Sequence, residues 1–423
     1  MITKLSSADW TTRDDIAALI AALGPGNARY VGGAVRDTFL GIAVKDVDIA
    51  TPLVPDEVIA RLNAAGIRNV PTGIEHGTIT AVLPFGPVEI TTLRHDVSTD
   101  GRRATVAFAT DWQEDAARRD FTINALYADP VTLEIADYFG GLDDLAVRRV
   151  RFIGDARSRI REDHLRILRY FRFQARFGSQ PADLEAEQSC AELAATLKGL
   201  SRERIGMEVL NLLGLPDPAP TVKRMAELGV LPEVLPEADP QALAALVAAE
   251  VREGIAPDPI RRLAALLPAD ADLALKVAGR FRLSGAQKKR LVVAAQRNCP
   301  PPQRGGAGGG GARRMPSVHA GVEHPHPTLP LTGGGLSARA LAYYLGMESA
   351  LDHLLLNGAD TAPLRNWEIP QFPLKGGQIV ARGVQAGPEV ARILEAVKTR
   401  WVAEGFPGEA WIEAALAGLV PLN

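Results

Sequence analysis

The feature that most constrains the fold is a pair of glycines near the start of the chain, in the stretch Tyr30-Val-Gly-Gly-Ala-Val-Arg-Asp37. The stretch predicts a strand that turns into a helix at Gly32 and Gly33, because glycine adopts backbone angles that other residues avoid. Amide groups at the start of such a helix can bind a phosphate. A Gly-Gly turn alone is more often only a tight turn, so the residues that follow decide between the two interpretations.

Two aspartates come next, in the stretch Lys45-Asp-Val-Asp-Ile-Ala-Thr51. Apolar Val47 and Ile49 alternate with Asp46 and Asp48, and a period of two places both carboxylates on one face of a strand. Paired carboxylates repel each other unless a cation lies between them, and Mg²⁺ prefers such hard oxygen ligands. An Asp-x-Asp alone is usually a solvated strand face. Beside a phosphate-binding turn it predicts a phosphoryl-transfer site with two Mg²⁺ ions.

Together, these residues resemble the opening of the polymerase-β-type nucleotidyltransferases, in the branch that holds the bacterial tRNA CCA-adding enzymes and poly(A) polymerases. The resemblance runs over about residues 27–210 through five motifs in family order. It implies an α+β protein of the eubacterial (class II) type. Its polymerase-β-type nucleotidyltransferase head would contain a small mixed sheet, and an all-α neck, body and tail would follow.

The bulk composition is that of an ordinary globular protein. The chain has 423 residues, which is long enough for two or more domains. Its net charge of −3 does not by itself indicate a nucleic-acid partner. Two cysteines without metal-like spacing indicate a reducing, cytoplasmic location. We expect no secretory signal and no membrane span, because the charged N-terminus lacks an apolar core and no apolar run is long enough.

Helix and strand signals alternate in the first part of the chain. Apolar spacing predicts a helix over Asp14–Leu23, and a second one over Pro55–Ala65. Strands over Gly77–Leu83 and Val88–Arg94 flank a turn and predict a hairpin. Glu89 lies on the second of these strands and is the candidate for a third carboxylate; a plain edge-strand charge fits equally well.

Changes in composition predict five parts. Residues 1–145 form the catalytic head and 146–215 a helical neck with the base-template helix and an RNA-binding stripe. Residues 216–299 form a helical body and 336–423 a helical tail. The Gly- and Pro-rich stretch 300–335 differs in composition from the sequence on both sides of it. We interpret it as a linker or an anomalous insertion rather than a histidine metal site.

A second signature lies in Ala116–Leu126, which contains Arg-Arg-Asp-Phe-Thr-Ile-Asn-Ala. Guanidinium groups meet phosphate oxygens in bidentate pairs, although a solvated charge cluster at a helix end is the simpler interpretation of these residues alone. This run of residues closely resembles the second motif of the family. That resemblance implies triphosphate contact for Arg119 and ribose-side roles for Asp120 and Asn124. The segment Arg94–Ala109 fits the family's flexible loop for switching from C to A addition, or an ordinary loop.

A third signature is Arg161-Glu-Asp-His-Leu-Arg-Ile-Leu-Arg-Tyr-Phe-Arg172. Its spacing predicts that Glu162, Asp163 and Arg166 meet on one helix face, where a simple ion pair would also satisfy them. A carboxylate beside a guanidinium can also imitate a complementary base edge that accepts C or A and rejects G and U. Glu-Asp-x-x-Arg resembles the family's protein template for the incoming base, which implies that role for Asp163 and Arg166.

Arginine is concentrated around this signature. Residues 148–176 hold ten arginines against three acidic residues, which predicts a surface for a polyanion. Further on, Leu200–Glu208 resembles the last family motif, a helix start that braces the template helix. Ser201 is its expected N-cap.

We therefore predict an enzyme that adds CCA to tRNA 3′ ends from CTP and ATP by Mg²⁺-dependent transfer, with the tRNA 3′ end and acceptor arm as partners and neither membrane nor DNA involved. The candidate catalytic residues are Asp46, Asp48 and Glu89, with Asp46 and Asp48 as the metal ligands. The candidate nucleotide-binding residues are Gly32, Gly33, Arg36, Arg119, Asp120, Asn124, Asp163, Arg166, Arg169 and Arg172. A poly(A) polymerase, a CC-adding or A-adding specialist, and a non-catalytic RNA-binding module remain as alternatives.

Overall fold

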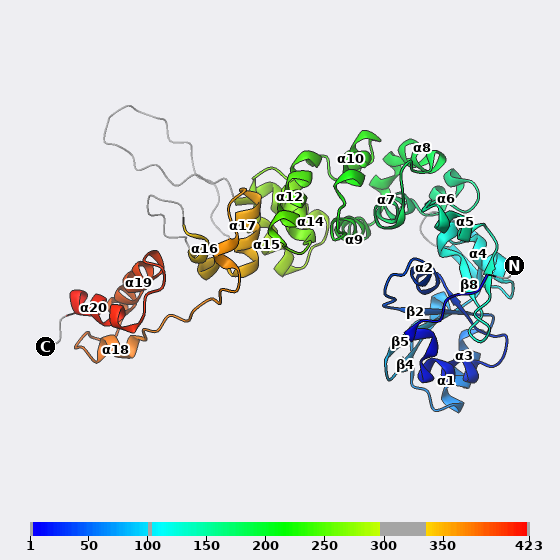
Figure 1. Ribbon diagram of the computed structural model, residues 1–423, viewed down its shortest axis with the longest axis horizontal. Helices are drawn as coiled ribbons and strands as arrows, with labels where there is room; N and C mark the ends of the chain where they lie inside the picture. The colour runs from blue at the N-terminus through cyan, green and yellow to red at the C-terminus, as the bar shows by residue number, and fades with distance from the viewer. Residues whose placement is uncertain (1–2, 100–103, 297–335, 421–423) are drawn as a thin grey trace. The chain divides into compact units, whose positions relative to one another are not determined.

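The computed structural model describes residues 3–99, 104–296 and 336–420 (Figure 1). The chain forms two compact units, residues 1–240 and residues 241–423. The predicted linker, 300–335, lies outside the described residues. The finer division into head, neck, body and tail stays a prediction.

The first unit contains one seven-stranded sheet in the order β3-β4-β5-β2-β1-β8-β9. The strands are β1 Arg29–Val31, β2 Val47–Thr51, β3 Asn69–Gly73, β4 Thr78–Leu83, β5 Gly86–Thr92, β8 Leu126–Ala128 and β9 Ile135–Asp137. β2 pairs with β5 in parallel, and the remaining neighbours are antiparallel. The prediction of an α+β fold with a small mixed sheet is confirmed.

Short helices pack beside this sheet. They are α1 Asp14–Leu23, α2 Gly33–Phe39, α3 Pro55–Ala64, α4 Trp112–Ala117 and α5 Gly141–Ala146. α1 begins and ends where the apolar spacing predicts, and its buried residues are Ile16, Leu19 and Leu23. α1 packs on α3, α3 packs on β4, and α2 contacts β1, β2 and β8. These contacts fix the start of α2 at the end of β1.

The hairpin predicted before residue 95 is confirmed, since β4 and β5 pair across a turn at Pro84 and Phe85. The segment Arg94–Ala109, expected to be a loop, is instead mostly a pair of strands, while its expected flexibility and role in switching from C to A addition stay predictions. β6 (Arg94–Thr99) pairs with β7 (Ala104–Phe108), while residues 100–103 lie outside the described part. Two consecutive residues, Thr105 and Val106, are β-branched, and such residues favour a strand. The polar start of the segment instead favoured a loop.

Helices make up the rest of the first unit. They are α6 Ala156–Glu162, α7 Arg166–Phe177, α8 Leu184–Glu192, α9 Arg202–Leu213, α10 Ala219–Glu227 and α11 Leu231–Val234. An aromatic cluster joins α7 to the part that carries the sheet: the ring of Phe121 lies 5.0 Å from Phe152 and 5.1 Å from Phe173, centroid to centroid. Such pairs add to the energy of burial, so the cluster fixes α7 against Phe121 and Phe152.

The described part of the second unit is helical, as predicted. Its helices are α12 Pro240–Glu253, α13 Pro259–Leu266, α14 Ala271–Arg280, α15 Gly285–Ala295, α16 Ala338–Leu345, α17 Met347–Leu356, α18 Gly376–Val380, α19 Pro388–Ala403 and α20 Glu409–Leu419. Leu246, Ala249 and Ala265 pack with Leu355 of α17. No helix in the described ranges is both long and apolar enough to cross a membrane.

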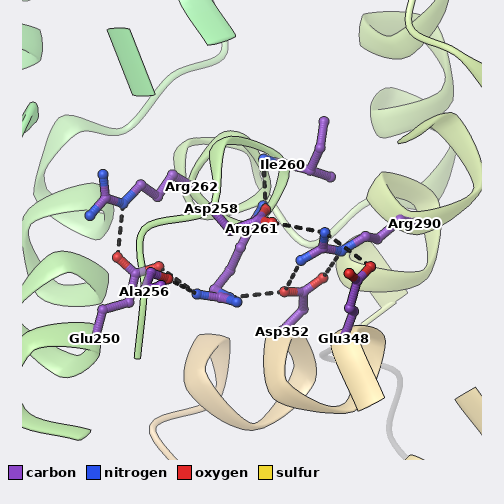
Figure 2. Close-up of polar contacts among 9 residues, drawn as sticks. All are labelled: Glu250, Ala256, Asp258, Ile260, Arg261, Arg262, Arg290, Glu348 and Asp352. Carbon is purple, nitrogen blue, oxygen red and sulfur yellow. Dashed lines mark hydrogen bonds and ion pairs between the residues drawn. The ribbon is translucent and has the colours of Figure 1, made fainter. Parts of the chain in front are cut away.

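A network of charged side chains, partly buried, links four helices of this unit (Figure 2). Its members are Glu250, Asp258, Arg261, Arg262, Arg290, Glu348 and Asp352. Asp352 is fully buried and accepts hydrogen bonds from Arg261 (2.9 Å) and Arg290 (2.6 Å). The network thus ties α13 and α15 to α17, which follows the undescribed segment in the chain.

Candidate active site

A cavity of about 600 Å³ lies where the sheet of the first unit meets α7 and α9. Its arginines are Arg36, Arg94, Arg118, Arg119, Arg166, Arg169, Arg172 and Arg204. Its carboxylates are Asp48, Glu89, Asp120 and Asp163. Arginine therefore exceeds acid twofold, and the cavity suits a polyanionic ligand that is itself accompanied by cations.

The acidic side of the cavity is made by two neighbouring strands. Asp48 of β2 and Glu89 of β5 are directly paired in the parallel register, and both line the cavity. Val47 and Ile49 are buried on the opposite face, as the alternation predicts. Asp46 is exposed just before β2 and does not line the cavity. The structure thus brings Asp48 together with Glu89 and leaves Asp46 at the edge.

The charge of Asp48 is uncompensated. Burial, the nearby Glu89 and Asp46 together raise its pKa to about 6, although Arg119 opposes them. Among the described residues, the side chains of Asp48 and Glu89 make no hydrogen bond or ion pair, and no ready-made cluster of three metal-binding side chains occurs. The two carboxylates are hard oxygen donors that lack a positive partner, so they fit a divalent cation that other ligands complete.

The glycine turn after β1, the strand next to β2, also lines the cavity. Gly32 has φ 68° and ends β1, so a residue with a side chain would be strained there. A Cβ at Gly32 would lie 3.4 Å from Nη1 of Arg119, and a Cβ at Gly33 would lie 3.7 Å from Nη2 of Arg36. The missing side chains leave room for a ligand to approach backbone amides and both guanidinium groups.

A chain of hydrogen bonds links the turn to α7. Arg36 donates to the side-chain oxygen of Asn124, and Asn124 donates to Asp120 (2.9 Å). Asp120 also accepts from Nε of Arg169 (2.8 Å) and from the amide of Phe121 (2.9 Å). Burial alone would raise the pKa of Asp120, but Arg169 and Asn124 outweigh it and lower the pKa. This carboxylate is therefore ionised and already engaged.

The third signature folds differently from its prediction. Glu162 ends α6, Asp163 caps it, and α7 begins only at Arg166. Asp163 pairs with Arg204 of α9 (2.7 Å), whereas Arg166 pairs with Glu162 (2.6 Å). The prediction of one continuous helix face is wrong, because the extended backbone of Asp163 (φ −149°) breaks the helix. Asp163 and Arg166 nevertheless both line the cavity.

The last motif braces α7, as expected. Arg172 of α7 pairs with Glu208 of α9 at 2.6 Å, and the two helices are in contact. Ser201 stands at the N-cap of α9, but its side chain makes no capping hydrogen bond. The prediction from the sequence did not include Arg204 as a site residue, although Arg204 lies within this motif and lines the cavity.

The arginine-rich stretch is less available than its composition suggested. Ion pairs occupy Arg149, Arg151, Arg157, Arg159, Arg166, Arg169, Arg172 and Arg176. Most partners lie elsewhere in the chain, namely Asp37, Asp120, Asp144, Glu192 and Glu208. A count of charges within the stretch could not include these partners, and the polyanion surface stays a prediction.

Sequence reasoning also missed Arg94, Arg118 and Phe173 as cavity residues. Phe173 lies four residues after Arg169, one helical turn along α7, which was a usable signal. The guanidinium carbons of Arg172 and Arg36 lie 4.9 and 5.3 Å from the centre of its ring. The ring therefore supports two cationic groups of the cavity.

Two protein-family models match the chain, and both matches lie almost wholly within the first unit. The family described as "Poly A polymerase head domain" matches residues 28–151. The family described as "Probable RNA and SrmB- binding site of polymerase A" matches residues 183–241. The first match spans the sheet and the glycine turn, and the second spans α8 to α11.

Individual relatives extend over more of the chain. CCA tRNA nucleotidyltransferase 1, mitochondrial, from Homo sapiens is 34% identical over 384 residues, which are 90% of this chain and 84% of that protein. A CCA-adding enzyme of Geobacillus stearothermophilus is 38% identical over 206 residues, 48% of this chain and 50% of that protein. The solved structure of the Bacillus stearothermophilus CCA-adding enzyme in complex with CTP gives a TM-score of 0.70 at 26% identity, covering 96% of this chain and 97% of that one.

Proposed function

The chain belongs to the CCA tRNA nucleotidyltransferase family, and we propose that it completes tRNA 3′ ends with CCA from CTP and ATP in the cavity of its first unit. The observation that carries the proposal is the composition of that cavity, where an uncompensated carboxylate pair faces a surplus of arginine. A nucleotide triphosphate, a tRNA end and divalent cations together supply the charges that such a cavity lacks.

In this proposal the glycine turn and its arginines hold the triphosphate. Gly32 and Gly33 leave space beside Arg119 and Arg36, so phosphate oxygens can approach both guanidinium groups. Arg36 is also bonded to Asn124, which places the ribose-side residues next to the phosphates. Asp120 acts mainly by orienting Asn124 and Arg169, since both of its oxygens are already engaged.

Asp48 and Glu89 hold the divalent cation at the reacting end of the nucleotide, with Asp46 reaching it from just before the start of β2. Mg²⁺ bound there would promote loss of the proton from the attacking 3′-hydroxyl and stabilise the leaving pyrophosphate. The carboxylates contribute position and charge, and the raised pKa of Asp48 supports the assignment because a cation would relieve the same repulsion.

Asp163 and Arg166 select the base. Arg166 is held by Glu162 and by the carbonyl oxygens of Arg159 and Arg118, at 2.9 Å each, so its orientation is fixed before a nucleotide arrives. A fixed donor beside a carboxylate acceptor can pair with the edge of C or A, whereas U and G would present mismatched groups.

The test is primer extension by the purified chain with Mg²⁺. Transcripts of tRNA ending before, within and after CC are each given CTP, ATP or both. Addition that stops at CCA is the expected result, and absence of incorporation would overturn the proposal. The control is Asp48→Ala, which keeps the fold and loses transfer.

The same assay separates the second candidate. A poly(A) polymerase is favoured by one specific observation, the description of the head family that matches residues 28–151. It would produce a long A tail in place of a single terminal A. Arrest after CC, or activity only on CC ends, would assign the chain to a pair of specialised enzymes.

We propose a reducing compartment as the site of action. The cytoplasm is the location predicted from two cysteines, and the buried Cys190 is free. The vertebrate relatives are named as mitochondrial, which fits the same chemistry in another compartment. Fractionation of the source cells, followed by detection of the chain, distinguishes the two locations.

A further inference from the structure

A buried carboxylate lies behind the arginine wall of the cavity. Asp115 of α4 is 1% exposed and does not line the cavity. Arg118 and Arg119, three and four residues further along the chain, do line it. Nothing in the sequence distinguishes this aspartate from the other acidic residues before the Arg-Arg pair, and only the fold shows what it contacts.

Both oxygens of Asp115 are fully used. Oδ1 accepts from Nε of Arg118 (2.8 Å) and from the amide of Arg94 (3.2 Å). Oδ2 accepts from Nη2 of Arg119 (3.1 Å) and from the hydroxyl of Tyr127 (2.6 Å). A carboxylate accepts about four hydrogen bonds, so this one is saturated by groups of the cavity wall and its support.

These bonds decide which part of Arg119 remains for a ligand. Its Nε donates to the hydroxyl of Tyr127 (3.0 Å) and its Nη2 donates to Asp115. The remaining nitrogen, Nη1, is the one nearest the glycine turn, 3.4 Å from where a Cβ of Gly32 would be. The guanidinium is thus clamped on one side and directed toward the cavity on the other.

We propose that Asp115 is a positioning residue for the triphosphate of the incoming nucleotide. It touches no ligand itself; it holds Arg118 directly, and it holds Arg119 both directly and through Tyr127. The inference rests on the proposed function, in which Arg119 contacts the triphosphate. Because the triphosphate is common to CTP and ATP, the effect of Asp115 is independent of the base.

The carboxylate of Asp115 is ionised in the folded protein. Burial alone would raise its pKa, but Arg119, Arg118 and the Tyr127 hydroxyl outweigh burial and lower the pKa to about 2. The group is therefore an anion at any pH at which the enzyme works, and replacing it by an amide removes both the charge and the second full acceptor.

The experiment uses the full chain with Asp115→Asn, and Tyr127→Phe as a milder second variant. We expect Asp115→Asn to raise KM for CTP and for ATP by the same factor, on the order of 10-fold, with a smaller change in kcat. Tripolyphosphate, which has no base, should lose affinity by a similar factor in calorimetric titration. Tyr127→Phe should give a smaller change in the same direction.

The matched control is Asp144→Asn. Asp144 is equally buried and also pairs with an arginine, Arg151, and a hydroxyl, Thr122, but Arg151 does not line the cavity. This variant should lower the melting temperature without changing KM for either nucleotide. A rise in KM equal to that of Asp115→Asn would show a general loss of structure and overturn the inference.

The variant Arg119→Ala separates the positioning role of Asp115 from the proposed contact of Arg119 with the triphosphate. If Arg119→Ala raises both KM values while Asp115→Asn changes neither, the positioning role fails and triphosphate contact stands. If Arg119→Ala leaves KM and tripolyphosphate binding unchanged, the assigned contact itself fails, and the role of Asp115 fails with it. A change that affects only CTP or only ATP would also contradict a role through the triphosphate.

Discussion

Two clusters of arginine and carboxylate, one in each unit, are built from the same groups and reach opposite outcomes. In the second unit three arginines meet four carboxylates, and Asp352 at the centre is fully buried (Figure 2). In the first unit arginines outnumber carboxylates around an open cavity. We call the cluster in the second unit balanced, because each of its arginines pairs with a carboxylate of the same cluster. The cavity of the first unit instead has more arginines than carboxylates among its lining residues.

The difference shows that arginine content by itself does not identify a binding site. Arg261 and Arg262 are adjacent in the sequence, as are Arg118 and Arg119, but the former are 5% and 1% exposed and pair with Glu250. What distinguishes the cavity is the neighbouring glycine turn, which withholds side chains, and the unpaired Asp48–Glu89 edge. A site is indicated where carboxylates without an ion-pair partner and guanidinium groups line the same empty space.

The largest effect should follow from breaking the acidic edge. Asp48→Ala should reduce nucleotide transfer at least about 10³-fold, because charge stabilisation at the reacting phosphate is lost. Its melting temperature should not fall, because Asp48 has no partner to lose and its charge is disfavoured by burial. Single-turnover extension and thermal unfolding measure the two quantities, and retained turnover would contradict the assignment.

Breaking the balanced cluster should have the opposite signature. Asp352→Ala leaves Arg261 and Arg290 buried without their shared anion, and we expect a loss of about 3–5 kcal/mol in the free energy of unfolding. KM for CTP should stay unchanged, since Asp352 belongs to the second unit. Urea denaturation provides the measurement. Glu348→Gln is the control, because Glu348 is 79% exposed although it lies 3.4 Å from Arg290. Equal loss in both variants would refute the buried-network interpretation.

The same contrast explains what the sequence could predict. Local rules placed the glycine turn, the strand with Asp48 and the hairpin with Glu89, because each depends on residues close together in the chain. The pairing of Asp163 with Arg204, and of Asp120 with Arg169, joins residues more than forty positions apart. Spacing within a single helix suggested a partner for Asp163, and the helix break at that residue removed it.

A third prediction concerns Asp115, which lies behind the cavity arginines and, like Asp352, is a buried carboxylate bonded to two arginines. Its pKa lies near 2, below its ordinary value of 3.8, so it contributes stability above about pH 4 and loses that contribution as the pH falls toward 2. We expect Asp115→Asn to be less stable than the parent by about 2 kcal/mol at pH 6. The difference should shrink steadily in urea titrations at pH 4, 3 and 2.5. A difference that is independent of pH would mean that the charge of Asp115 is not what stabilises the wall.

The smallest effect should come from a substitution of Arg204. This arginine has an ion-pair partner, Asp163, as the arginines of the balanced cluster do, but its side chain is 45% exposed. Arg204→Gln frees the Asp163 carboxylate without opening the core, so stability should change by less than about 1 kcal/mol. Discrimination between CTP and UTP, measured as the ratio of kcat/KM, should fall about 10-fold because the acceptor that reads the base is no longer held. Arg202→Gln, at an exposed position of the same helix, should leave that ratio unchanged. If both variants discriminate as the parent does, Asp163 is oriented without Arg204, and their ion pair is a surface contact of little functional weight.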